Sequence, residues 1–186
     1  SAVIFDGNMV NNTYAWSNTN QTIGLAATGN GNIGSFTALN PTGVAQSSTV
    51  TYTPSITMNN VQCSGQPLNF DFMVNPSPTV NPVQDIYLCE GFYSPQLTFS
   101  GQFSGTQYNW YNDNTSIGLV NSGLNTMNPF LSVNNGVVPI VANLNVVPNM
   151  QFGNLNCYGN PMEFSITVNP QPIVNAPISQ VVCNGA

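Results

Sequence analysis

Ten residues carry the side chains with which this chain could do chemistry: six carboxylates and four cysteines. The 186 residues include no Lys, Arg or His, and the formal net charge is −6 at pH 7. Phosphate clamps, nucleic-acid grooves and docking to anionic membranes need cations, so these functions are excluded. Histidine bases, Schiff-base lysines and Ser-His or Cys-His nucleophile pairs are excluded for the same reason.

The carboxylates show no spacing that indicates a site. They are Asp6, Asp71, Asp85, Glu90, Asp113 and Glu163. A glycosidase needs two carboxyls about 5–10 Å apart across a cleft, and calcium loops need closely spaced acids. Asp85 and Glu90, which flank one expected strand, are the carboxylates that could bind calcium together with linker carbonyls. We expect solvated surface acids, no metal or cofactor, no catalytic residue and therefore no enzyme.

These ten residues must be positioned by an internal repeat. TYAWSNTNQTIGL, from Thr13, resembles QYNWYNDNTSIGL, from Gln107, and the two tryptophans, Trp16 and Trp110, are 94 residues apart. The same offset pairs Cys63 with Cys157 and Cys89 with Cys183, without a gap. We call two residues separated by this offset counterparts. Self-similarity at a fixed period indicates a tandem array, and no acid of this chain has an acidic counterpart.

Each repeat is expected to be all-β. Short alternations of apolar and polar residues, such as QLTFSG and MEFSITVNP, are separated by Gly, Asn and Pro clusters. Seven strands in under a hundred residues are typical of an immunoglobulin-like sandwich. We therefore predict two tandem immunoglobulin-like β-sandwich domains. In the second repeat we place the strands at 84–89, 96–101, 107–111, 116–119, 128–133, 138–147 and 162–169.

Four aromatic residues are predicted to lie in the cores of these sandwiches. Tyr108 and Trp110 are two residues apart and so share one face of a strand, as do Tyr14 and Trp16. Sandwiches of this kind bury a tryptophan in that strand. The alternative is a carbohydrate-binding module in which Trp16 and Trp110 are sugar platforms, and solvent exposure of the two rings distinguishes the two hypotheses.

The cysteines have two pairings with different meanings. Cys63 with Cys89 and Cys157 with Cys183 would use all four, but an extended strand and linker separate Cys63 from Cys89 by about 30 Å. A disulfide needs Cα atoms within about 7 Å. We therefore predict a bond between Cys89 and Cys157 inside the second repeat, because we place both at the same pole of the sandwich. Such a bond implies an oxidising compartment.

This pairing leaves Cys63 and Cys183 to bond with a neighbouring repeat or subunit. We expect residues 1–82 to form repeat one without its first strand, 83–176 to form repeat two, and 177–186 to be the first strand of a following repeat. Two explanations remain open. The chain is a window from a long tandem array, or it is a subunit whose segment 177–186 completes the sheet of the next subunit by strand addition.

The amino-acid sequences of both repeats are similar to those of a known family. VVCNGA, YNWYNDNTSIGL, NCYGNPMEFSITVNP and NPxPxV resemble the tandem PKD-like, or Ig-like, repeats of giant cell-surface proteins of Bacteroidota. That group includes gliding-motility adhesins exported by type IX secretion. The resemblance implies an extracellular β-sandwich repeat with no catalytic residues.

These observations lead to one expected function. We expect a structural and adhesive repeat unit of an extracellular bacterial filament or long surface adhesin. The expected partners are further copies of the chain or neighbouring repeats in a head-to-tail fibre, with surface glycans as a further partner. Nucleic acid and membrane insertion are not expected.

Overall fold

The computed structural model describes residues 2–185, and the fold is all-β. Thirteen strands and two short 3-10 helices account for the regular structure of these residues. Over the same residues no helix has the length and apolar character needed to cross a membrane. The alternation of apolar and polar residues is therefore expressed as strands, as the sequence predicts.

The described chain divides into two compact units. Unit 1 comprises the chain through Thr79 with Gln102–Thr106 and Asn149–Gly159, and unit 2 comprises Val80–Gly101, Gln107–Pro148 and the chain from Asn160 onward. The division after Thr79 lies close to the expected boundary after residue 82. The two short segments assigned to unit 1 from within the second repeat were not anticipated, because compactness depends on contacts rather than on repeat boundaries.

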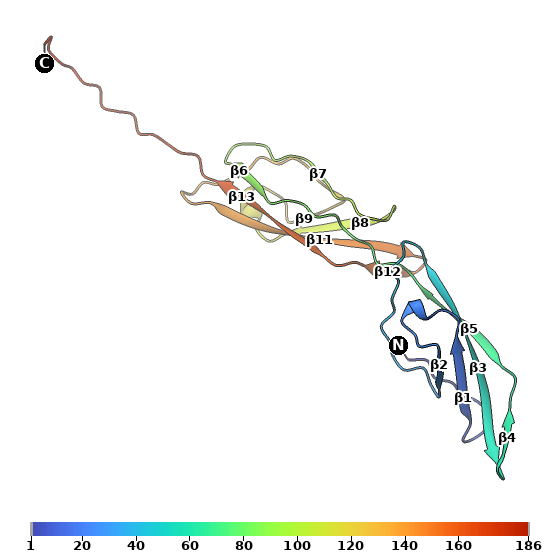
Figure 1. Ribbon diagram of the computed structural model, residues 1–186. Helices are drawn as coiled ribbons and strands as arrows, with labels where there is room; N and C mark the ends of the chain where they lie inside the picture. The colour runs from blue at the N-terminus through green and yellow to red at the C-terminus, as the bar shows by residue number, and fades with distance from the viewer. Residues whose placement is uncertain (1, 186) are drawn as a thin grey trace. The chain divides into compact units, whose positions relative to one another are not determined.

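The first repeat builds one sheet of five strands, ordered β2-β1-β3-β4 with β5 also on β3 (Figure 1). All of its pairs are antiparallel. The elements are β1 (Thr13–Asn18), η1 (Gln21–Ile23), β2 (Thr28–Asn30), β3 (Gln46–Met58), β4 (Val61–Ser64) and β5 (Leu68–Val74).

The second repeat builds a sheet ordered β6-β13-β11-β8-β9, with β12 also on β11. Here β6 runs parallel to β13, whereas β13 is antiparallel to β11. β7 and β10 form a separate two-stranded sheet. The elements are β6 (Ile86–Cys89), β7 (Leu97–Thr98), β8 (Gln107–Asn112), η2 (Thr115–Ile117), β9 (Ser122–Leu124), β10 (Thr126–Met127), β11 (Ile140–Phe152), β12 (Leu155–Tyr158) and β13 (Met162–Asn169).

The repeat seen in the sequence is also present in the element bounds. β1, η1, β2, β3 and β4 recur as β8, η2, β9, β11 and β12 with both ends shifted by 94 residues. β5 and β13 begin at counterparts, Leu68 and Met162. The bridge between Val3 and Ile33 likewise has the pair Leu97 and Met127 as its counterpart. Only β6 has no counterpart among the described residues of unit 1.

Two expected strands are replaced by other structure. Ser116 and Ile117 of the expected strand 116–119 lie in η2, because the Asn114 side chain accepts a hydrogen bond from the Ser116 N–H and Gly118 ends the turn at φ 94°. Within 128–133 only an isolated bridge at Leu131 forms. The hairpin of β11 and β12 was not predicted either, since its turn residue Gly153, at φ 58°, follows a run without strict alternation.

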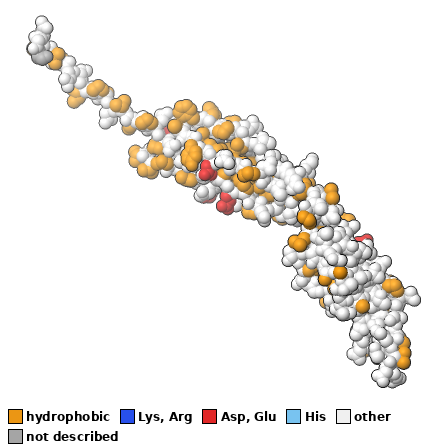
Figure 2. All heavy atoms as spheres, in the orientation of Figure 1, with side chains coloured by type: hydrophobic (Ala, Val, Ile, Leu, Met, Phe, Trp, Pro, Cys, Tyr) orange, Lys and Arg blue, Asp and Glu red, His pale blue; other side chains and the backbone are white. Residues whose placement is uncertain are grey.

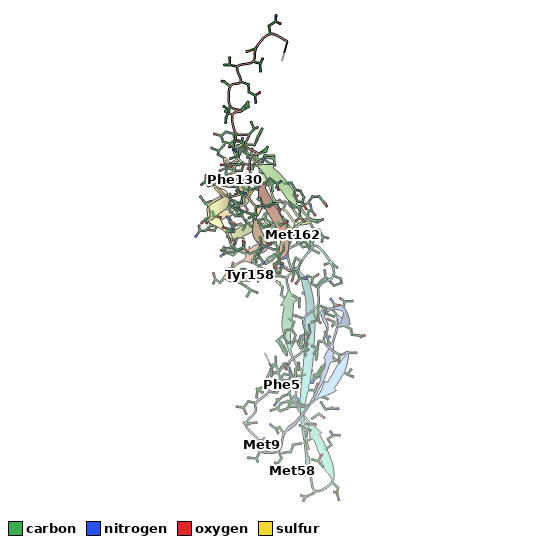
Figure 3. All side chains as sticks on the ribbon, turned by 90° about the vertical axis from the view of Figure 1, so that its left-hand side faces the viewer. Phe5, Met9, Met58, Phe130, Tyr158 and Met162 are labelled. Carbon is green, nitrogen blue, oxygen red and sulfur yellow. The ribbon has the colours of Figure 1, made fainter. Side chains whose placement is uncertain are left out.

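The core of unit 2 holds thirteen buried residues among those described, from both of its sheets. Met127, on β10, is fully buried, and Leu97 on β7 packs against the same cluster as Leu144 and Ile166 of the larger sheet. Two sheets that share one apolar core make a sandwich-type arrangement. Phe130 and Met162, labelled in Figure 3, belong to this core and its margin.

Each tryptophan packs on a glycine of the neighbouring strand. Trp16 lies opposite Gly29, and Trp110 lies opposite Gly123. A Cβ built on Gly123 would meet the Trp110 ring at 2.3 Å, and the clash at Gly29 is equally severe. Glycine is therefore required at both positions so that the ring can cover the strand backbone.

Candidate interaction site

Three of the six acids line one shallow depression of about 560 Å³ on the sheet of unit 2. Asp113 accepts hydrogen bonds from the backbone and side-chain nitrogens of Asn143, at 2.7 and 2.8 Å. Asp85 accepts from the Ser165 N–H at 2.7 Å, and Glu163 accepts from Asn145. Figure 2 shows acidic side chains, in red, within a surface that is otherwise uncharged. Across the part of the chain that is described, no three acids or cysteines are grouped to hold a metal ion.

Asp113 gives unit 2 a specific sensitivity to acid. The hydrogen bonds from the Asn143 side chain and backbone hold the pKa of Asp113 below its ordinary value of 3.8. The stability that the ionised carboxylate contributes is present above that value and is lost as the pH falls through the lowered pKa. In unit 1 the counterpart Thr19 accepts from Thr49, the counterpart of Asn143, through a hydroxyl that does not titrate.

Asp113→Thr is therefore expected to flatten the pH dependence of unit 2 stability below about pH 4. Thermal unfolding between neutral pH and pH 2 would measure the effect. The matched control is Asp85→Ser. Asp85 is another hydrogen-bonded acid of the same depression, and its counterpart in the segment after β13 is Ser179. An acid-induced loss of stability that remains unchanged in Asp113→Thr would contradict the assignment.

The four cysteines, all within the described residues, are free thiols. The predicted bond between Cys89 and Cys157 is therefore wrong. Cys89 lies opposite Asn169, the last residue of β13, whereas Cys157 precedes Met162, the first residue of that strand. A strand of this length spans over about 20 Å, well beyond disulfide reach. Our prediction placed Cys89 at the pole where the last strand starts, but Cys89 lies opposite the residue at which β13 ends.

The same register bears on the two cysteines that were expected to bond to a neighbour. Cys63 lies opposite Ile56, at the hairpin of β3 and β4. Cys183 lies beyond the last strand, where no strand forms in residues 170–185 and residues 171–185 are exposed. The expected first strand, 177–186, is thus not a strand in its described part, and Ala186 lies outside the described residues.

The four aromatic residues expected in the cores lie there. Tyr14, Trp16, Tyr108 and Trp110 are between 3% and 9% exposed. A sugar platform needs an exposed ring face, and neither indole offers one. The alternative of a carbohydrate-binding module with Trp16 and Trp110 as platforms is therefore wrong in its choice of residues.

Asparagine side chains hold the loops, a role that was not predicted from the sequence. Asn112 donates to the carbonyls of Leu119 and Val120 at 3.1 and 3.2 Å, and its counterpart Asn18 bonds the corresponding carbonyls. Asn134 and its counterpart Asn40 each donate to two carbonyls as well. The recurrence of these asparagines at the offset of 94 was the signal that could have revealed them.

The most distinctive surface of unit 1 is the outer edge of β5. In unit 2 the corresponding edge of β13 is covered by β6, with Ile86 opposite Ile166 and Leu88 opposite Val168. β5 pairs with β3 on one side, and no described residue pairs with its other side. The edge thus presents unused backbone donors and acceptors.

The core beside this edge is correspondingly less buried. Six positions of the hydrophobic core cluster of unit 2 are only half-buried at their counterparts in unit 1. On β5 itself Leu68 is 56% and Met73 is 70% exposed. These six counterparts are Phe5, Phe36, Tyr52, Phe70, Phe72 and Val74. Among the described residues only five side chains form the fully buried centre of this core.

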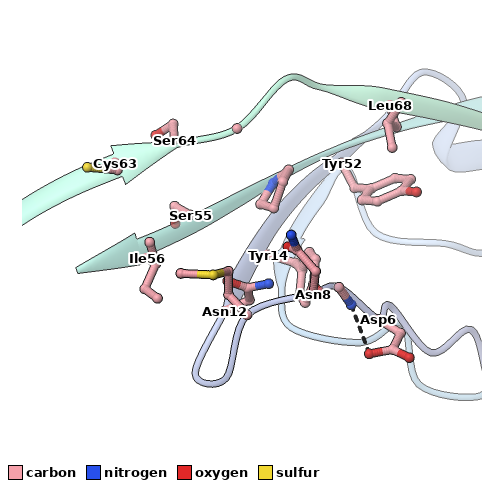
Figure 4. A pocket seen from close by; sticks show the side chains of 14 residues that line it. Asp6, Asn8, Asn12, Tyr14, Tyr52, Ser55, Ile56, Cys63, Ser64 and Leu68 are labelled. Carbon is pink, nitrogen blue, oxygen red and sulfur yellow. Dashed lines mark hydrogen bonds between the residues drawn. The ribbon is translucent and has the colours of Figure 1, made fainter. Parts of the chain in front are cut away.

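A pocket of about 430 Å³ opens at the end of the same core. Tyr14, Tyr52 and Leu68 form apolar walls, and the loop carrying Asp6 and Asn12 forms its rim (Figure 4). The Asp6 carboxylate accepts a hydrogen bond from the Gly7 N–H, shown as the dashed line in Figure 4. Tyr52 also stacks on Phe5, with ring centroids 4.5 Å apart. The pocket is mostly apolar and of the size of a binding site.

The segment after β13 carries apolar side chains that are exposed to solvent. Ile173, Val174, Ile178 and Val181 are at least 90% exposed, and Val182 is 72% exposed. The segment carries no charged residue. Figure 2 shows hydrophobic side chains, in orange, spaced along the C-terminal segment.

The open edge of β5 and the pocket, both in unit 1, form a candidate interaction site, and the apolar segment after β13, in unit 2, is a second one. Their backbone groups and apolar side chains suit pairing with a protein strand. No protein-family model, curated protein or solved structure matches this chain.

Proposed function

We propose that the chain is a structural and adhesive repeat unit of an extracellular bacterial filament or long surface adhesin, built of immunoglobulin-like domains and without catalysis. The observation that carries the proposal is the recurrence of five complete elements, with both bounds shifted by 94 residues. A repeat of whole domains serves length and multivalency, because each copy adds the same surface and the same span.

The chemistry of the chain supports this role. Loops are held by asparagine side chains bonded to backbone carbonyls rather than by ion pairs, since there is no Lys, Arg or His. Trypsin has no cleavage site anywhere in the sequence, and a surface with few charges depends little on ionic strength. A material outside the cell benefits from both properties.

The location and the partners are proposed on the same basis. The residues that resemble surface repeats of Bacteroidota support a cell-surface or secreted filament exported by type IX secretion. The partners are further copies of the chain or neighbouring repeats, arranged head to tail. Surface glycans are the proposed adhesion targets, contacted by surfaces other than the two buried tryptophans.

Protease treatment of intact source cells tests the location. Proteinase K is expected to remove the chain from unbroken cells, while trypsin leaves its repeats uncut, with detection by an antibody raised against residues 1–186. A cytoplasmic protein that survives both treatments is the control for cell integrity. Protection from proteinase K until the cells are lysed would contradict an extracellular function.

A further inference from the structure

We propose that residues 173–183 of one copy of the chain complete unit 1 of a second copy, lying parallel to β5 and over the pocket at the end of its core. The inference rests on the proposed function in one respect, namely that copies act together. It adds the segment, the acceptor surface and the register. The second repeat supplies the template, because it contains both halves of this contact within one chain.

The strand half of the template is β6 on β13. Ile86, Tyr87, Leu88 and Cys89 lie opposite residues 166–169, in parallel. Moving β6 forward and β13 back by the repeat offset of 94 residues places residues 180–183 beside β5. In this register Gln180 lies opposite Phe72, Val182 opposite Val74 and Cys183 opposite Asn75. Leu88 packs on the core of unit 2, so Val182 faces the half-buried Phe72 and Val74. Tyr87 is 69% exposed, so Val181 faces outward.

The backbone of β5 has N–H groups that point toward the proposed donor strand. In unit 2 the Ser165 N–H points away from β11 and is bonded by Asp85. N–H groups alternate sides along a strand, so Thr167 also points its N–H toward β6. The counterparts Asp71 and Met73 therefore direct their N–H groups outward from β5, where no described residue accepts a hydrogen bond from them.

The linker half of the template covers the pocket. The Asn81 N–H donates to the Ser100 carbonyl at 2.7 Å, and the Asn81 side chain donates to the Ser100 hydroxyl at 3.1 Å. Val80 and Val83 pack against the core of unit 2. Asn81 and Val80 recur unchanged as Asn175 and Val174. The counterpart of Ser100 is Asp6, on the rim of the pocket, so Asn175 binds there and Val174 enters the pocket.

The contact so defined is heterologous: the donor segment and the acceptor surface are different parts of the chain. Repetition of such a contact extends into a filament rather than closing into a symmetric dimer. The donor segment carries no charge, so association depends on apolar burial and strand pairing. We expect its affinity to change little with NaCl concentration.

Two variants separate donor from acceptor. Met73→Pro removes an outward N–H of β5 and blocks the acceptor, while Met73→Thr, which introduces the residue found at the counterpart Thr167, keeps that N–H. A chain ending at Pro172 has the acceptor but no donor. Sedimentation velocity should show each of these single-defect chains as a monomer, the Met73→Thr chain as an assembling species, and a mixture of the two defective chains as a one-to-one dimer.

The side-chain directions of the donor segment, residues 173–183, provide the sharpest test. Val181 and Val182 are both exposed in the free chain, but only Val182 is placed against the acceptor core. Val182→Asp is expected to weaken association about a hundredfold, because it buries a carboxylate, whereas Val181→Asp leaves association within about threefold. Equal effects of the two variants would overturn the register.

Cross-linking tests the same register directly. In a Cys63→Ser background, Asn75→Cys is expected to form a disulfide with Cys183 of a second copy, since directly paired residues bring Cα atoms within disulfide reach. The wild-type chain should form no Cys63–Cys183 bond, since the two thiols lie at opposite ends of β5. That native bond, or no bond from Asn75→Cys, would overturn the proposal.

Self-association and surface location give separable outcomes. A wild-type chain that remains monomeric at all concentrations overturns the contact and leaves the surface role standing. Edge coverage by residues upstream in a longer natural polypeptide would appear as protected β5 amides in native material without self-association of residues 1–186, and it would also overturn the contact. Assembly in solution combined with protection from proteinase K on intact cells would instead support the contact and contradict the surface role.

Discussion

Replacing Trp110 by alanine is expected to lower the free energy of unfolding of unit 2 by about 3–5 kcal/mol. The indole is 3% exposed, packs over Gly123 and donates a hydrogen bond from Nε1 to the Thr126 carbonyl at 3.2 Å. Its removal leaves a cavity that the flanking β-strands cannot close, because Gly123 has no side chain to fill it. Urea unfolding followed by circular dichroism, with amide exchange of β13, measures the loss.

Tyr111→Ala is the matched control, because Tyr111 follows Trp110 on β8 and is 54% exposed. It should change stability by less than about 0.5 kcal/mol. Trp16→Ala should also destabilise unit 1, but by less than its counterpart, since the buried Trp16 Nε1 has no hydrogen-bond partner among residues 2–185 to lose. A cost below about 1 kcal/mol for Trp110→Ala would contradict the placement of the ring at the centre of the core.

Replacing Asn134 by leucine is expected to destabilise unit 2 by about 2–4 kcal/mol. Asn134 is fully buried, donates to the carbonyls of Val138 and Val168 at 2.9 and 2.7 Å, and accepts from the Gly136 N–H. Leucine has as many side-chain heavy atoms as asparagine, but it leaves all three backbone groups without this partner. The bond to Val168 is buried and the other two are part-buried, and an unpaired buried group costs about 1–3 kcal/mol. Thermal unfolding and loss of amide protection at Gly136 would report the change.

Asn135→Leu, at the exposed neighbouring position, is the control for changing an asparagine of the same loop. The counterpart substitution Asn40→Leu breaks the same set of bonds in unit 1, where they lie nearer to water. It should therefore cost less than Asn134→Leu. If Asn134→Leu is neutral, the asparagines do not hold the loops and their recurrence needs another cause.

The all-β class, the two repeats and the burial of the tryptophans could be predicted because they depend on local patterns. Alternation of apolar and polar residues is visible within a few residues, and the repeat offset is visible without any folding. The expected strand at 116–119 failed for a local reason as well: the cap at Asn114 and the turn at Gly118 favour a 3-10 helix over the apolar alternation.

The cysteine pairing failed because it depends on register rather than on composition. The sequence shows that Cys89 follows an apolar run, but not that this run pairs with only the second half of β13, in parallel. A shift of a few residues along a strand moves a thiol by the 10 Å or so that decide whether a disulfide can form.

By itself, the sequence determined which chemistry this protein cannot do, that it repeats, and that it folds as β-strands, since these follow from residue types and their spacing. Only the tertiary structure decided that β6 covers β13 in parallel, that β5 is the strand whose corresponding edge no described residue covers, and that asparagines hold the loops. The physical reason is that strand pairing and side-chain-to-backbone bonds join segments far apart in the sequence, so direction and register arise only when those segments pack.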